Sequence, residues 1–148
     1  MKTRSAKILF ADDEPAIRRV AAMALSRAGY NVTTVANGHA AWKLLEIDTF
    51  DLLITDNQMP QMTGEELVFK VREYGLGLPI IVAASQLEFF LNTDNDWLQV
   101  AQLLQKPFGL IKLMRAVERV LSEGSLCSPN QRISTVPYSM ALAQKEHR

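Results

Sequence analysis

Four charged side chains in this sequence follow short apolar runs. Asp12 and Asp13 close the run AKILFADD, Asp56 closes FDLLITD, and Lys106 follows QLLQ directly before Pro107. In open parallel α/β sheets, ligands bind beyond the carboxyl ends of the strands. Apolar strands that end on a charge are therefore suited to deliver a nucleophile or a metal ligand to one edge of a sheet.

The combination of these groups indicates a specific chemistry. Three carboxylates at one edge would repel each other and raise each other's pKa values. A hard divalent cation removes this conflict, and Mg²⁺ favours a few carboxylates together with water and phosphate oxygens. The ammonium of Lys106 could reach a phosphate oxygen across the same crevice. A carboxylate nucleophile, Mg²⁺ and a lysine are the parts needed for phosphoryl transfer to an aspartate, where positioning and charge neutralisation provide most of the catalysis.

The elements that must position these groups alternate between two periodicities. Short apolar runs predict five strands, and segments with apolar residues at helical spacing predict helices between them. This alternation requires a parallel sheet with helices on both faces. The predicted strands are 6–13, 30–37, 50–56, 78–85 and 102–106, and the clear helices are 13–30, 38–48, 63–75 and 109–121.

The segment 86–101 does not fit a single helix. Phe89, Phe90, Trp97 and Leu98 favour burial, but the intervening NTDND consists of residues that favour caps and turns. We therefore expect a broken or shifted fourth helix in this region.

Composition narrows the class of protein. A chain of 148 residues with 48% hydrophobic and 22% charged residues fits one globular domain with a substantial core. Sixteen basic residues balance sixteen acidic ones, so no net charge draws the molecule to nucleic acid or anionic lipid. No apolar stretch approaches the roughly 20 residues of a membrane span. The single Cys127 cannot form an internal disulfide, and a cytoplasmic protein is expected.

The chain is expected to divide into a domain over residues 1–121 and a tail. Residues 122–148 contain Ser and Pro and have sparse periodicity, which is typical of a flexible C-terminal segment. They are too few for a second globular domain, so no output domain is expected. A small docking helix around residues 138–144 is the alternative for this segment.

Three motifs in this chain resemble those of the receiver domains of bacterial two-component response regulators. They are ADDE, DLLITDNQMPQMTG and KPF, in the right order and at the right separations, and the resemblance covers residues 6–121. It implies a flavodoxin-like, doubly wound sheet of five parallel strands in the order 2-1-3-4-5, with helices on both faces. It also implies a cis peptide bond between Lys106 and Pro107.

The resemblance assigns roles to residues and implies partners. Asp56 is the expected phosphoacceptor, and Lys106 is the lysine that contacts the phosphoryl group. The expected ligands of Mg²⁺ are Asp12, Asp13, Asp56 and the backbone carbonyl of Gln58. A histidine kinase or a phosphotransfer protein would donate the phosphoryl group, and an unidentified downstream protein would read it. Such a domain is no enzyme beyond its own phosphorylation and dephosphorylation, and the sequence leaves open whether it forms a homodimer.

Two positions depart from the family pattern. Receivers usually carry Ser or Thr near the end of the fourth strand, and here that position is Ala84. The aromatic residue usually found three residues before the lysine is replaced by Leu103. Ser85 lies next to Ala84, but strand side chains alternate between faces, so its hydroxyl is expected to point away. The chain therefore lacks the hydroxyl and the aromatic side chain that usually form the relay from the phosphoryl group.

Two other classes of protein share part of this pattern. Aspartate-nucleophile phosphatases also place Asp at a strand end, but with a second Asp two residues on, where this chain has Gln58. A degenerate receiver that binds partners without phosphorylation is the second alternative, favoured by the two departures and opposed by Asp56 and Lys106. His39 and His147 have no partners at ligand spacing and are expected at the surface.

Overall fold

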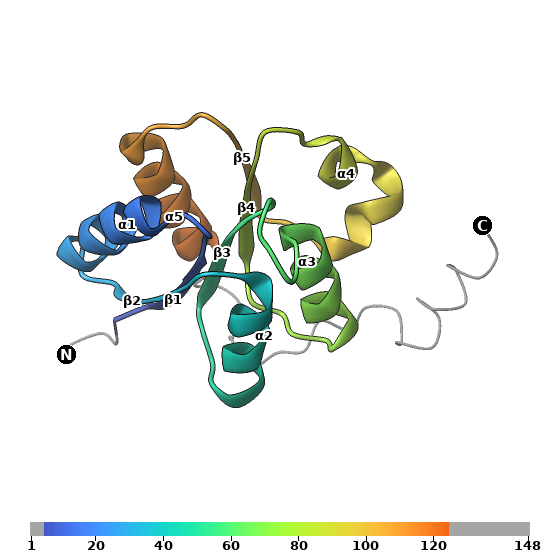
Figure 1. Cartoon of the computed structure of the whole chain (residues 1–148), viewed down its shortest axis with the longest axis horizontal. Coiled ribbons are helices and arrows are strands. Elements are labelled where there is room, and N and C mark those ends of the chain that lie inside the picture. The colour runs from blue at the N-terminus through green and yellow to red at the C-terminus, as the bar shows by residue number, and fades with distance from the viewer. Residues whose placement is uncertain (1–4, 125–148) are drawn as a thin grey trace.

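Five parallel strands form one sheet in the order β2-β1-β3-β4-β5 in the computed structural model of the chain, with helices on both faces (Figure 1). The structure describes residues 5–124. The strands are β1 (Lys7–Ala11), β2 (Asn31–Val35), β3 (Leu52–Asp56), β4 (Ile80–Ala84) and β5 (Gln102–Gln105). The helices are α1 (Pro15–Arg27), α2 (Gly38–Ile47), α3 (Gly64–Glu73), α4 (Glu88–Leu91), the 3₁₀ helix η1 (Thr93–Leu98) and α5 (Leu110–Gly124). The predicted flavodoxin-like fold and strand order are confirmed.

Each face of the sheet has its own apolar core, because consecutive strand residues point to opposite faces. Leu9 and Leu53 belong to a core with residues of α2, α3 and η1. Ile8 and Ile54 belong to a second core with residues of α1 and α5. Every residue of β3 and β4 is buried, which is typical of central parallel strands covered on both sides.

The register of the strands brings their carboxyl ends to one edge of the sheet. Ala11 at the end of β1 pairs with Thr55, so Asp12 follows β1 at the level where β3 reaches Asp56. Asp56 pairs with Ala83 of β4, and the N–H of Lys106 donates to the carbonyl of Ala84 over 2.9 Å. The segments that carry the candidate site residues therefore converge at this edge.

The fourth helical region is broken, as the sequence predicts. Helix α4 has only four residues, and Asn92 interrupts the helical path with extended backbone angles. The side chain of Asn92 accepts a hydrogen bond from Asp94 N–H at the start of η1, and Gln99, directly after η1, has a positive φ of 50°. The polar NTDND stretch thus forms caps and turns, while Phe90 and Leu98 on either side reach the core.

Arg72 of α3 binds the backbone at the end of η1, a contact that the sequence did not predict. Its Nε donates to the carbonyl of Leu98 over 2.6 Å, and its Nη2 donates to that of Gln99 over 3.1 Å. Its Nη1 donates to the carbonyls of Leu76 and Leu78 over 2.7 and 2.9 Å. Burial lowers the pKa of Arg72 to about 10, so the guanidinium remains charged at neutral pH.

The last helix continues past the expected boundary at Leu121 and ends at Gly124. The expected tail therefore begins no earlier than residue 125, and its residues lie outside those that the structure describes. Among residues 5–124, no helix combines the length and apolar character needed to cross a membrane.

Candidate functional site

Asp12 and Asp13 follow β1 and differ in their surroundings. The Asp12 side chain is buried, and its Oδ1 accepts a hydrogen bond from the N–H of Glu14 over 2.9 Å. Its backbone is fixed by an N–H bond to the carbonyl of Val35 over 3.1 Å and by Arg18, which donates to the Asp12 carbonyl over 2.7 Å. Asp13 is exposed to solvent. The turn after β1 thus offers one buried and one exposed carboxylate.

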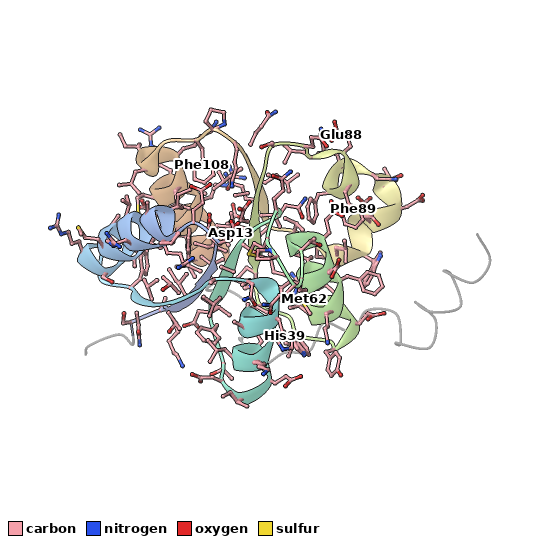
Figure 2. All side chains as sticks on the ribbon, in the orientation of Figure 1. Asp13, His39, Met62, Glu88, Phe89 and Phe108 are labelled. Carbon is pink, nitrogen blue, oxygen red and sulfur yellow. The ribbon has the colours of Figure 1, made fainter. Side chains whose placement is uncertain are left out.

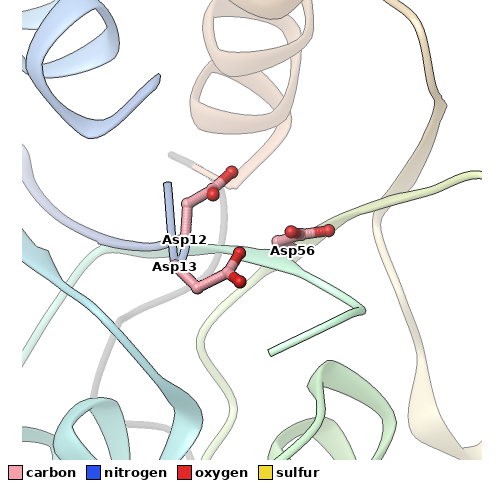
Figure 3. A group of neighbouring side chains, drawn as sticks. All are labelled: Asp12, Asp13 and Asp56. Atoms are coloured by element: carbon pink, nitrogen blue, oxygen red, sulfur yellow. The ribbon is translucent and has the colours of Figure 1, made fainter. Parts of the chain in front are cut away.

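Asp56 ends β3 with its side chain only 4% exposed. Figure 3 shows its carboxylate beside those of Asp12 and Asp13, beyond the ends of β1 and β3. One carboxylate oxygen from each residue lies within 4.8 Å of the other two. The structure therefore brings together the three carboxylates that the sequence selects.

Lys106 completes the group from the end of β5. Its Nζ lies 2.8 Å from Oδ1 of Asp56, which makes a salt bridge with the buried carboxylate. The peptide bond between Lys106 and Pro107 is cis, as the resemblance implies.

The charges of the site perturb one another. Burial raises the pKa of Asp12, and the negative charges of Asp56 and Asp13 raise it further. The hydrogen bond from Glu14 N–H and the positive charge of Lys106 lower this pKa by less, so it is raised overall. Burial alone would lower the pKa of Lys106, but the hydrogen bond and charge of Asp56, with the charges of Asp12 and Glu14, raise it overall. Lys106 is therefore charged at neutral pH, and the metal-free site disfavours ionisation of Asp12.

The donor set fits a magnesium ion. Mg²⁺ binds hard oxygen ligands, keeps several waters and uses only a few carboxylates. The three clustered aspartates supply such oxygens, and their mutual repulsion would be relieved by a divalent cation. Gln58 lies two residues beyond Asp56 and, together with Asp13, lines an open depression of about 620 Å³.

The loop from Asp56 to α3 is packed closely against the start of that helix. A Cβ atom at Gly64 would lie 2.5 Å from the carbonyl oxygen of Asp56, so only glycine allows this approach. The Asn57 side chain donates to the carboxylate of Glu65 and accepts from the backbone N–H of Glu65. The sequence interpretation did not single out these two residues. The available signal was an Asn directly after the strand-ending Asp, with a Glu placed in the first turn of the following helix.

The positions that depart from the family pattern lie beside the site. Ala84 is the last residue of β4 and is buried, and it offers no hydroxyl. Ser85 follows the strand and is exposed. Leu103 packs against the core on the α2 and α3 face of the sheet. The buried methyl group of Ala84 and the aliphatic side chain of Leu103 thus occupy the places of the hydroxyl and the aromatic ring of the family pattern.

The remaining candidates do not join the site. His39 lies exposed near the start of α2, away from Asp13 (Figure 2). His147 and Cys127 fall outside the described residues. Trp42 and Phe90 are core residues, and Phe89 and Trp97 are partly buried against the same core.

This chain is similar to response regulator receiver domains in both sequence and structure. The family model described as a response regulator receiver domain matches residues 8–118. The response regulator receiver protein CpdR of Brucella abortus is 38% identical over 115 residues, which cover 78% of this chain and 96% of CpdR. The DNA-binding transcriptional regulator NtrC of Bradyrhizobium is 36% identical over 128 residues, which cover 86% of this chain but 26% of NtrC. Among solved structures, response regulator TrrA of Thermotoga maritima, in complex with Mg²⁺-BeF, has a TM-score of 0.68 at 28% identity, with 78% of this chain and 98% of TrrA covered.

Proposed function

Because the chain belongs to the family of response regulator receiver domains of two-component systems, we propose that it accepts a phosphoryl group on Asp56 in a Mg²⁺-dependent reaction. The donor is a histidine kinase or a phosphotransfer protein, and another protein reads the phosphorylated state. One observation carries the proposal: the buried Asp56 carboxylate lies 2.8 Å from Lys106 and within 4.8 Å of oxygens of Asp12 and Asp13. The Mg²⁺-BeF complex of the similar protein TrrA supports it.

In the transfer step, a carboxylate oxygen of Asp56 attacks the phosphorus of a phosphohistidine. A P–O bond forms as the P–N bond breaks, and the imidazole of the donor keeps the electron pair. Lys106, which contacts Asp56 before the reaction, neutralises charge on the phosphoryl oxygens. Mg²⁺ supplies further neutralisation of these oxygens when bound, and its ligands would be Asp12, Asp13, Asp56 and the carbonyl of Gln58. The chain thus catalyses only its own phosphorylation and dephosphorylation.

A groove between α1 and α5 is suited to contact with the donor. It has a volume of about 460 Å³, and Asp12 and Lys106 of the site contribute to its lining. The rest of the lining is mostly apolar, and two of its side chains, Val20 and Leu110, are 54% and 42% exposed. An exposed apolar surface next to a reactive group favours docking of a partner protein.

The test is phosphorylation with acetyl phosphate and Mg²⁺, followed by intact mass. The wild-type chain should gain the mass of one phosphoryl group, and the gain should be lost in Asp56→Asn and on chelation of Mg²⁺. Asp96→Asn changes an exposed carboxylate of η1 and should label like wild type. Undiminished labelling of Asp56→Asn would place the acceptor elsewhere.

A second function is favoured by the residues at the switch positions. Ala84 and Leu103 offer neither the hydroxyl nor the aromatic ring of the usual relay, which fits a receiver that binds partners without phosphorylation. The same mass measurement separates the two. A wild-type chain that takes no label from acetyl phosphate in the presence of Mg²⁺ would support the binding module.

A further inference from the structure

Asn57, the residue after the proposed phosphoacceptor, is held from two sides. Its N–H donates to the carbonyl of Ala83 in β4 over 2.9 Å, and its carbonyl accepts from the N–H of Gly64 over 2.9 Å. Its side-chain Oδ1 accepts from the N–H of Glu65 over 2.9 Å, while its Nδ2 donates to Oε1 of Glu65 over 3.2 Å. These four hydrogen bonds tie Asn57 to the sheet and to the first turn of α3.

The close approach of α3 makes these contacts possible. A Cβ atom at Gly64 would lie 2.7 Å from Cα of Asn57, a distance too short for two carbon atoms that are not bonded. The absent side chain lets the first N–H groups of α3 point directly at Asn57. The hydrogen bonds between Asn57 and Glu65 therefore require the close approach of α3 that Gly64 allows.

A purely structural role for Asn57 would be the capping of α3. The first four N–H groups of a helix have no partner within the helix. In α3, Asn57 accepts from the N–H groups of Gly64 and Glu65, and Oγ1 of Thr63 accepts from Glu66 N–H over 3.2 Å. Thr63 thus provides a matched comparison, because it caps the same helix without contacting the Asn57 side chain.

We propose that the pair of Asn57 and Glu65 positions the backbone carbonyl that binds the metal. Both peptide groups of Asn57 are fixed, so only the backbone torsions of Gln58 separate this anchored point from the Gln58 carbonyl. Asn57, Gln58 and Glu65 line the same depression as Asp13. Asn57 and Glu65 are positioning residues, and the inference rests on the proposed Mg²⁺ site. Residues that orient metal ligands typically contribute roughly 10–100-fold to metal affinity.

The first test measures the Mg²⁺ dissociation constant from amide chemical shifts at Gln58. Asn57→Ala removes both contacts and should weaken binding roughly tenfold. In the metal-free variant, the N–H groups of Gly64 and Glu65 should exchange with solvent faster than in wild type. Glu66→Gln removes an exposed charge from the same turn of α3, and Thr63→Ala removes the hydroxyl that caps Glu66 N–H. Both controls should bind Mg²⁺ within about threefold of wild type.

A reciprocal exchange separates geometry from charge, and it remains available if Asn57→Ala does not fold. Asn57→Asp keeps the shape of the side chain but sets a carboxylate against Glu65. Adding Glu65→Gln restores a donor and an acceptor in swapped positions, with the net charge of wild type. The double variant should bind Mg²⁺ more tightly than Asn57→Asp alone, although it carries one negative charge fewer.

The outcomes are distinct. Mg²⁺ binding by Asn57→Ala within about threefold of wild type would overturn the inference, because outer contacts that orient ligands have larger effects. An equal loss in Thr63→Ala would assign the effect to loosening of α3, and an equal loss in Glu66→Gln would assign it to charge. Either result also overturns the inference. A wild-type chain without affinity for Mg²⁺ would instead overturn the proposed function itself.

Discussion

Asp12 is the carboxylate whose ionisation the fold opposes. Burial raises its pKa above the ordinary value of 3.8, and the charges of Asp56 and Asp13 add to this effect. The folded state therefore binds the Asp12 proton more tightly than the unfolded state does. The resulting stability is present at low pH and is lost as the pH rises from 3.8 through the raised pKa.

Replacement of Asp12 by Asn should therefore stabilise the metal-free protein at neutral pH. The amide oxygen can still accept the Glu14 N–H bond, while the buried charge and its repulsions are removed. We expect the melting temperature in a chelator to rise by a few degrees near neutral pH, and Mg²⁺ affinity to fall.

The pH dependence provides the control for this prediction. Below pH 3.8, Asp12 is protonated in both states, so the difference in melting temperature between the variant and wild type should shrink. Asp13→Asn changes an exposed carboxylate and should stabilise the metal-free protein less. A lower melting temperature of Asp12→Asn at neutral pH would show that the charge does not destabilise the fold.

Lys106 should support phosphoryl transfer without being needed for metal binding. Lys106→Met keeps the apolar stem and removes the ammonium that lies 2.8 Å from Asp56. Labelling by acetyl phosphate should slow by roughly a hundredfold, which is typical of the loss of one group that stabilises transition-state charge. Mg²⁺ affinity should hold or increase, because a competing cation is gone. Lys112→Met, at an exposed position of α5, is the matched control, and equal labelling rates in both variants would make Lys106 a surface charge only.

At the scale of elements, Arg72 connects α3 to the end of η1. Its guanidinium donates to four backbone carbonyls, two of which belong to Leu98 and Gln99. Arg72→Met retains much of the volume and leaves these carbonyls without their donor. We expect a loss of about 3 kcal/mol in the free energy of unfolding, measured by urea denaturation. Arg115→Met on the exposed face of α5 should have little effect, and a loss of under about 1 kcal/mol for Arg72→Met would contradict the anchoring role.

The response of the segment after β4 should be small, because Ala84 has no hydroxyl. A hydrogen bond to a charged group contributes about 1.5–3 kcal/mol. Conversion of a two-state equilibrium from about 1:99 to 99:1 requires about 5.5 kcal/mol of differential interaction. Without the hydroxyl, a substantial part of that difference is missing. Amide shifts of residues 84–104 on addition of beryllofluoride should therefore be small in wild type and larger in Ala84→Thr.

Valine distinguishes the hydroxyl from the added volume in this experiment. Ala84→Val has the shape of the threonine variant without its hydroxyl, and it should respond no more than wild type. Ala84 is buried, so a larger side chain at this position lowers stability. The valine and threonine variants are therefore compared only if they lose a similar free energy of unfolding. A large wild-type response that persists in Ser85→Ala would contradict the prediction.

At the scale of the whole molecule, the regular elements and the core follow from local patterns. The buried runs of β3 and β4 have no polar alternation, and the apolar positions of α5 recur at helical spacing. The spatial order of the strands came from the resemblance of the motifs. The gathering of Asp12, Asp56 and Lys106 then follows, because parallel strands end at one edge.

Two features could not be predicted from the sequence, for a physical reason. Arg72 lies on the same face of α3 as Val68, so helical spacing indicates a buried position for its side chain. Helical spacing does not indicate that backbone carbonyls would accept hydrogen bonds from this buried cation. The Asn57 and Glu65 pair depends on the distance to which Gly64 lets α3 approach the loop. Both contacts are fixed by tertiary distances that periodicity does not encode.

The site draws its charged groups from the ends of β1, β3 and β5, so it is spread over almost the whole length of the domain. During synthesis from the N-terminus, Asp12 and Asp13 emerge first, Asp56 later, and Lys106 only when most of the domain has been made. A nascent or prematurely ended chain that stops before Lys106 carries Asp56 without the lysine that pairs with it. Under the proposed function, efficient phosphoryl transfer would therefore require a chain that has been synthesised past β5 and has closed the sheet.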